Sequence, residues 1–268
     1  MTTITTGSFL GRIPYARRGD GSAPLLILSG GQGFVRRSDP LRLARDARRV
    51  ARMLPEQASF VLLGYDPHPP ANISSDAITD DIAAIIKEHW SGKASIVGIS
   101  YGGLVASRVA ARWPEQVARL ILVASAHRFS TEGAQRVHRL IKFAEKGDFR
   151  SFVDEFAAIC RRPWLNCAIR LRVWFTRHKL DRTLASPETI VRYMRAMLDA
   201  QPPELSAIAA RTLVIGGSED QFFGGGAMHE TAAAISSARI ELLQGETHMA
   251  PVERARAVAA VIGRFLAT

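Results

Sequence analysis

The sequence predicts an α/β protein, with a mostly parallel sheet flanked by helices and one all-helical insertion. Short apolar runs alternate with amphipathic helical patterns along most of the chain, which is typical of parallel strands joined by crossover helices. One stretch of about 75 residues contains helical patterns alone. The chain has 268 residues, of which 47% are hydrophobic, so it can bury one large core.

The predicted strands are rich in leucine, isoleucine and valine and lack polar alternation, which suits a sheet covered on both faces. They span residues 25–29, 59–64, 94–99, 119–124, 211–215 and 239–243. The helical patterns that separate and follow them span residues 41–53, 75–89, 101–112, 227–236 and 252–266. Near the start of the chain, residues 8–12 and 15–18 are predicted to form an antiparallel hairpin at the sheet edge.

The insertion is predicted between the fourth and fifth of these strands. Its helical patterns span residues 133–146, 164–178 and 187–199, together with an apolar stripe at Phe149, Phe152, Val153 and Phe156. We therefore divide the chain into a core domain of residues 1–126 and 205–268 and a helical domain of residues 127–204. The helical domain has 15 Lys and Arg against 9 Asp and Glu, so it contributes +6 of the total charge of +10.

The composition excludes several classes of protein. Of the 35 basic residues 30 are arginines, scattered singly or in pairs without a platform of aromatic residues, so we do not expect nucleic-acid binding. No apolar run approaches the ~20 residues that span a bilayer, and the start lacks the pattern of a secretory signal. Cys160 and Cys167 are expected to be free thiols, which favours a cytoplasmic protein. The oligomeric state stays open.

The strongest local motif is Gly98-Ile99-Ser100-Tyr101-Gly102, between a predicted strand and a predicted helix. A serine on such a tight turn projects its hydroxyl from the sheet edge, next to the amino end of the helix. The strained backbone crowds the positions two before and two after the serine, and glycine at both removes the clash. This context predicts Ser100 as a nucleophile.

A serine nucleophile needs a base, and the base needs an acid to orient it. Asp220 follows the strand at 211–215 and His248 follows the strand at 239–243. The carboxyl ends of parallel strands meet at one edge of a sheet, so these side chains can converge on Ser100. Glu219 is the alternative acid, and Glu246 is interpreted as a solvated loop charge.

A glycine-rich turn follows the first buried strand, at Ser29-Gly30-Gly31-Gln32-Gly33. Its backbone can approach a tetrahedral oxygen and donate an amide N–H to it. We predict an oxyanion hole made by the amides of Gly31 and Tyr101, with Gln32 as the alternative to Gly31.

With these motifs, the sequence resembles the α/β-hydrolase superfamily in its form with a helical cap between strands six and seven. The resemblance covers about residues 8 to 266 and implies the α/β-hydrolase fold, with a catalytic triad at Ser100, Asp220 and His248. Two segments depart from the family pattern. Ser29-Gly30 stands where the family often has His-Gly, and residues 65–73 lack the common Arg-Gly-x-Gly-x-Ser motif.

The resemblance implies hydrolysis of a carboxylic ester through an acyl-enzyme on Ser100, without metal or organic cofactor. A lactonase, a carbon–carbon bond hydrolase, a thioesterase or an acyltransferase would use the same triad. A non-catalytic ligand receptor on the same fold is the alternative from another class.

The substrate is expected to be a small acyl compound, and Gln32, His127, Trp174 and Met194 are candidates for its pocket. Each of the last three has a structural alternative: His127 as a hinge or surface residue, and Trp174 and Met194 as packing between cap helices. The positive cap would attract an anionic or carrier-bound substrate. The alternative is that its arginines only solvate the cap surface.

Overall fold

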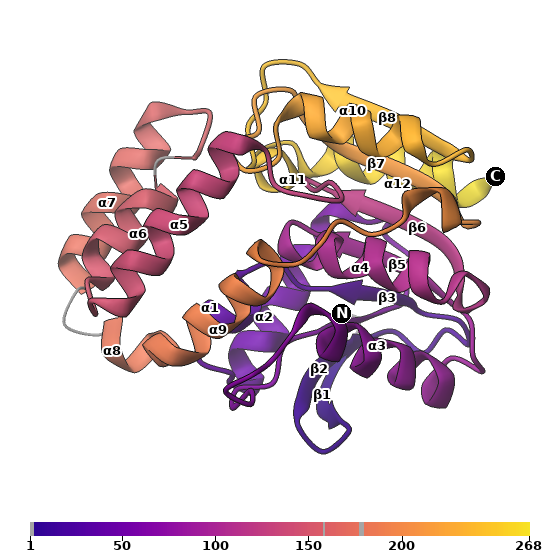
Figure 1. Ribbon diagram of the computed structural model, residues 1–268, viewed down its shortest axis with the longest axis horizontal. Helices are drawn as coiled ribbons and strands as arrows, with labels where there is room; N and C mark the ends of the chain where they lie inside the picture. The colour runs from indigo at the N-terminus through magenta and orange to yellow at the C-terminus, as the bar shows by residue number, and fades with distance from the viewer. Residues whose placement is uncertain (1–2, 158, 177–179) are drawn as a thin grey trace.

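The computed structural model describes residues 3–157, 159–176 and 180–268. Within these residues an eight-stranded sheet runs through the molecule in the order β1-β2-β4-β3-β5-β6-β7-β8 (Figure 1). The strands are β1 Ile4–Phe9, β2 Ile13–Arg18, β3 Leu25–Leu28, β4 Phe60–Leu63, β5 Ala94–Ile99, β6 Val117–Val123, β7 Arg211–Gly217 and β8 Ala238–Leu243. β3 to β8 are parallel, so the predicted α/β class with a mostly parallel sheet is confirmed.

The antiparallel hairpin at the sheet edge begins earlier than predicted. β1 pairs with β2 from Ile4↔Arg18 to Phe9↔Ile13, and β2 continues the pairing onto β4. Leu10 and Gly11 both have positive φ and form the turn, so the strand prediction for residues 10–12 was wrong. The polar run before residue 8 hid the first half of β1, because an exposed edge strand needs no apolar residues.

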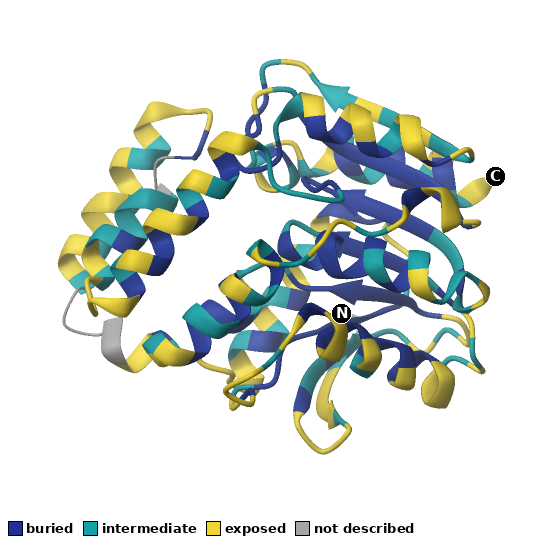
Figure 2. Cartoon of the chain, viewed as in Figure 1, coloured by how far each residue is buried: buried dark blue, intermediate teal, exposed yellow. Residues whose placement is uncertain are grey.

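Helices cover both faces of the sheet, and a buried apolar core lies between the sheet and the helices on each face (Figure 2). On one face lie α3 Ser75–His89, α4 Tyr101–Arg112 and α10 Gly224–Ala234, and on the other α2 Pro40–Val50 and α12 Ala255–Ala267. The bounds of α3 and α4 are those predicted. The last predicted helix is broken at Arg254, where the backbone leaves the helical region, into α11 Ala250–Glu253 and α12. Among the helices that the structure describes, none combines the length and the apolar composition that a bilayer span requires.

The segment between β6 and β7 is helical, as the sequence patterns indicate. It contains α5 Thr131–Glu145, α6 Phe149–Ala157, α7 Pro163–Thr176, the unpredicted short α8 Leu180–Thr183 and α9 Pro187–Leu198. The end of the predicted helix at residues 164–178 lies outside the described residues. The other short helices are α1 Gln32–Val35 and the 3₁₀ turns Ala51–Met53, Pro114–Gln116 and Leu205–Ala207. α9 packs against α1 and α5, whereas α7 packs against α6 (Figure 1).

The start of α5 is held tightly against the loop after β7. A Cβ atom at Gly133 would lie 1.7 Å from the carbonyl oxygen of Phe222, which a side chain cannot do without moving one of the two backbones. The Ser130 side chain caps α5 by accepting from the Gly133 amide, and its own amide donates to Phe222 O. The helical segment and the core are therefore joined backbone to backbone at this point.

We expect Gly133→Ala to lower the free energy of unfolding by about 2–3 kcal/mol, because the added methyl group overpacks this contact. Gly226→Ala is the matched control. Gly226 is exposed in α10, an added Cβ would meet no atom within 4 Å, and alanine should raise the stability by about 0.5–1 kcal/mol. Urea unfolding of both variants measures the difference, and equal stabilities would contradict the close contact.

Candidate active site

Ser100 stands on a strained turn between β5 and α4. Its φ of 52° and ψ of −121° lie where residues other than glycine are rare. A Cβ at Gly98 would lie 2.5 Å from the Cα of Gly103, and a Cβ at Gly102 would lie 2.2 Å from the carbonyl oxygen of Leu28. The turn therefore needs glycine at both positions, as the motif predicts.

Ser100 also faces the glycine-rich turn after β3. A Cβ at Gly30 would lie 3.3 Å from the Cβ of Ser100, so the two backbones are neighbours. Gly31 is the N-cap of α1 and Tyr101 is the first residue of α4. Amides at these positions have no acceptor within their own helix, which leaves them to donate elsewhere. The amide of Gly33 is the first that donates within this turn, to Gly30 O. Gly31 and Gln32 both precede it, so the choice of oxyanion donor between them stays open.

The side chains of Ser100, His248 and Asp220 are joined by hydrogen bonds. Ser100 Oγ lies 2.9 Å from His248 Nε2, and His248 Nδ1 lies 2.8 Å from Asp220 Oδ2. A carboxylate can only accept, so a neutral imidazole here carries its proton on Nδ1 and leaves Nε2 free to accept from the serine hydroxyl. This is the arrangement in which an imidazole can remove a proton from serine.

The Asp220 carboxylate is buried and held from two sides. Its Oδ1 accepts from the amides of Phe222, at 2.8 Å, and Phe223, at 2.9 Å, while Oδ2 faces His248. The rings of Phe222 and Phe223 lie 4.8 Å and 5.9 Å from the imidazole, whose side chain is 11% exposed. The acid and the aromatic wall thus come from one loop, which fixes the imidazole in position.

The two competing acids have different surroundings. Glu219 is exposed, and its backbone amide donates to Glu246 O. Glu246 was predicted to be solvated, and this is wrong: its side chain is 4% exposed, with Oε1 2.5 Å from Arg161 Nη1 and 3.5 Å from Arg254 Nη1. Arg161 lies between α6 and α7, so the loop of His248 is tied to the helical segment by an ion pair. The two partners are 85 residues apart, so no local pattern reveals the pair.

Four aromatic rings that the sequence analysis missed pack together behind Ser100. Phe34, Tyr65, Tyr101 and Tyr193 are buried with ring centroids 4.8–5.5 Å apart. The Tyr101 hydroxyl donates to Tyr193 O at 2.7 Å, and the Tyr193 hydroxyl donates to Asp66 O at 3.0 Å. Burial raises the pKa of Tyr65 and Tyr101 well above the usual value, so both stay neutral donors. Because these rings come from α1, the loop after β4, α4 and α9, only the fold brings them together.

The structure does not bring the four pocket candidates together. His127 donates its amide to Thr231 Oγ1 of α10 at 3.1 Å, and burial lowers the pKa of its imidazole. Trp174 is 49% exposed on α7, more than expected of a residue that lines a pocket or packs between cap helices. Met194 is buried in the apolar core on α9, and Gln32 is exposed at the start of α1.

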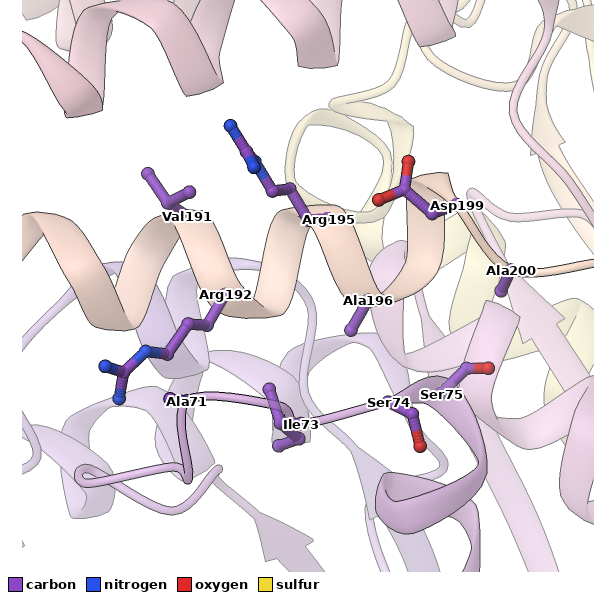
Figure 3. A pocket seen from close by; sticks show the side chains of 10 residues that line it. All are labelled: Ala71, Ile73, Ser74, Ser75, Val191, Arg192, Arg195, Ala196, Asp199 and Ala200. Atoms are coloured by element: carbon purple, nitrogen blue, oxygen red, sulfur yellow. The ribbon is translucent and has the colours of Figure 1, made fainter.

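Two cavities lie beside α9, and both are separate from the serine. One, of about 380 Å³, lies between α9 and the segment leading into α3, with Ile73, Ser74 and Arg192 among its lining residues (Figure 3). The other, of about 200 Å³, is lined by His127 and Met197 among others. Neither is lined by a residue of the Ser100 hydrogen-bonded chain, so we assign no substrate to them.

The chain belongs to the alpha/beta hydrolase family, whose model matches residues 25–261. It is 29% identical over 241 residues to 2-hydroxymuconate semialdehyde hydrolase of Pseudomonas sp. (strain CF600), across 84% of this chain and 78% of that protein. A segment of 65 residues is 42% identical to pimeloyl-[acyl-carrier protein] methyl ester esterase of Photobacterium profundum, which is 24% of this chain and 25% of that protein.

The fold is shared with the enol-lactonase from Burkholderia xenovorans LB400, with a TM-score of 0.76 and 22% identity across 98% of this chain and 100% of that one. The resemblance inferred from the motifs is confirmed, and the protein is a hydrolase of the α/β type.

Proposed function

We propose that the protein is a serine hydrolase that cleaves a carboxylic ester through an acyl-enzyme on Ser100. The observation that carries this proposal is the continuous hydrogen-bonded chain from Ser100 Oγ through His248 to Asp220. Each member has the group its role requires: a hydroxyl to attack, an imidazole to move the proton, and a buried carboxylate to orient the imidazole.

In this mechanism His248 Nε2 removes the hydroxyl proton while Ser100 Oγ attacks the ester carbonyl. The amides of Tyr101 and of Gly31 or Gln32 donate to the oxyanion that develops. The imidazolium then protonates the leaving alcohol, and the acyl group stays on the serine. Water, activated by the same imidazole, attacks the acyl-enzyme and releases the acid and the free serine.

A carbon–carbon bond hydrolase is the second candidate, because the long match is to 2-hydroxymuconate semialdehyde hydrolase. The same serine chain would serve a lactonase, a thioesterase or an acyltransferase, and fold alone does not choose among them. A non-catalytic receptor would keep the shape of the site without turnover. We also infer that residues 127–204 act as a cap domain, whose excess of arginine would favour an anionic or carrier-bound substrate.

We expect a panel of esters, lactones, acyl thioesters and 2-hydroxymuconate semialdehyde to show the highest kcat/KM for a carboxylic ester. Ester cleavage needs only the transfer of one proton to the leaving oxygen, whereas carbon–carbon cleavage first requires ketonisation of a dienol. Purified protein and its Ser100→Ala variant are compared on each compound. A clear preference for the semialdehyde would replace the ester proposal with the second candidate.

We expect a fluorophosphonate probe to label the protein once, at Ser100, because this hydroxyl is the one activated by His248. Ser100→Ala should abolish the labelling and lower kcat by about 10⁴-fold or more. Peptide mass spectrometry locates the adduct. Ser236, which is exposed between α10 and β8, provides a control: Ser236→Ala should keep the label. An adduct on another serine would exclude the proposed nucleophile.

The two neighbouring acids give a matched pair of variants. Asp220→Asn should lower kcat by about 10³–10⁴-fold with the fold intact, since the imidazole loses the partner that fixes its tautomer. Glu219→Gln should change kcat by less than about tenfold, because this exposed side chain does not contact the imidazole. Steady-state kinetics and circular dichroism of both variants decide the assignment, and the reverse order of effects would give the role to Glu219.

A further inference from the structure

Helix α7 exposes an apolar face to solvent. Its large side chains Trp164, Leu171, Trp174 and Phe175 are 61%, 57%, 49% and 62% exposed, and they account for four of the seven exposed large hydrophobic residues of the described chain. The helix lies on the outer side of the helical segment, where it packs against α6 (Figures 1 and 2). Single exposed apolar residues are normal in soluble proteins, but a cluster of this kind marks an interaction surface.

The exposed residues form one stripe along the helix. At 3.6 residues per turn, Trp164, Leu171 and Phe175 follow each other at spacings of seven and four, so they share one side. Cys167 and Ala168 are exposed on the same side. The opposite side, with Leu165, Ile169 and Val173, is half-buried toward the rest of the protein. α7 is therefore apolar on both sides, a composition expected of a helix that is covered on both.

Arginines border the stripe on each edge. Arg170 lies four residues before Trp174, and Arg172 lies three residues before Phe175, so the two flank the stripe on opposite sides; both are exposed. From residue 161 to 183 the sequence has seven Lys and Arg and one Asp, and α7 itself contains no acidic residue. Tryptophan rings are favoured at the level of the lipid headgroups, and arginines beside them can meet acidic headgroups, so a stripe of this composition suits a membrane interface.

We propose that α7 binds the surface of an anionic phospholipid bilayer, with the stripe in the boundary between headgroups and acyl chains. The charge favours this occupant, because the flanking arginines would meet acidic headgroups. A second copy of the chain would instead bring the same arginines against each other across the interface. A bilayer can also receive a helix that protrudes from the protein, because lipids rearrange around it, whereas a protein partner would need a matching groove. This inference is independent of the reaction proposed for Ser100.

The test uses the full-length Ser100→Ala protein, so that vesicle lipids are not hydrolysed. It is mixed with vesicles of phosphatidylcholine alone or with phosphatidylglycerol, and bound protein is separated by flotation. We expect binding to the anionic vesicles that weakens as salt is added. A polarity-sensitive dye on Cys167, the exposed one of the two cysteines, should shift to shorter wavelength on binding. Absence of binding to anionic vesicles would overturn the proposal.

Variants then tie the binding to α7. Trp164→Ser and Phe175→Ser should each lower the partition coefficient about tenfold or more, and Arg170→Gln about fivefold. Leu41→Ser, at a side chain 75% exposed on α2, is the matched control and should bind as before. All four positions are exposed, so the thermal midpoint should stay unchanged. Equal binding by all variants, or a dimer in light scattering that Phe175→Ser dissociates, would assign the stripe to another partner and overturn the proposal.

Discussion

The turn that carries Ser100 forms because three positions around it have no side chain. With φ at +52°, Ser100 projects its hydroxyl away from the turn. The chain passes so close to itself, to β3 and to Ser125 that no Cβ atom fits at Gly98, Gly102 or Gly103. The Ser125 hydroxyl, just after β6, donates to Ser100 O at 2.7 Å and holds the turn from the other side. Asp220 and His248 follow the ends of two other parallel strands, so the hydrogen-bonded chain forms only because this turn holds the Ser100 hydroxyl in place.

The elements nearest this turn were also those for which the sequence patterns were most accurate. β5 and α4 have the predicted bounds because their signals are local: a short apolar run, then glycines, then a helical repeat. The same holds for α3, which begins where the Ser74 side chain accepts from the Ala77 amide. The edge hairpin was predicted less well, since β1 exposes most of its side chains and carries no apolar pattern.

What sequence reasoning could not provide is the set of contacts between distant segments. Glu246 is buried and forms an ion pair with Arg161 of the helical segment. No sequence pattern near either residue indicates this pair. Tyr65 and Tyr193 belong to different parts of the chain and meet through packing. The exposure of Trp174 was missed for the opposite reason: an apolar helix is expected to be covered, and only the three-dimensional arrangement reveals that this residue is 49% exposed.

Helices α9 and α7 of the helical segment are attached to the core differently, because α9 contributes to the aromatic cluster and α7 does not. α9 is joined to the core by Tyr193, whose ring contacts Phe34 and Tyr65 and whose carbonyl accepts from the hydroxyl of Tyr101, the residue directly after Ser100. A displacement of α9 would strain the very residue whose amide is expected to donate to the oxyanion. Among the larger contacts between elements of the described chain, α7 packs on α6 alone. Substitutions on the outer side of α7 would therefore alter the proposed membrane contact without displacing Tyr193 or Tyr101.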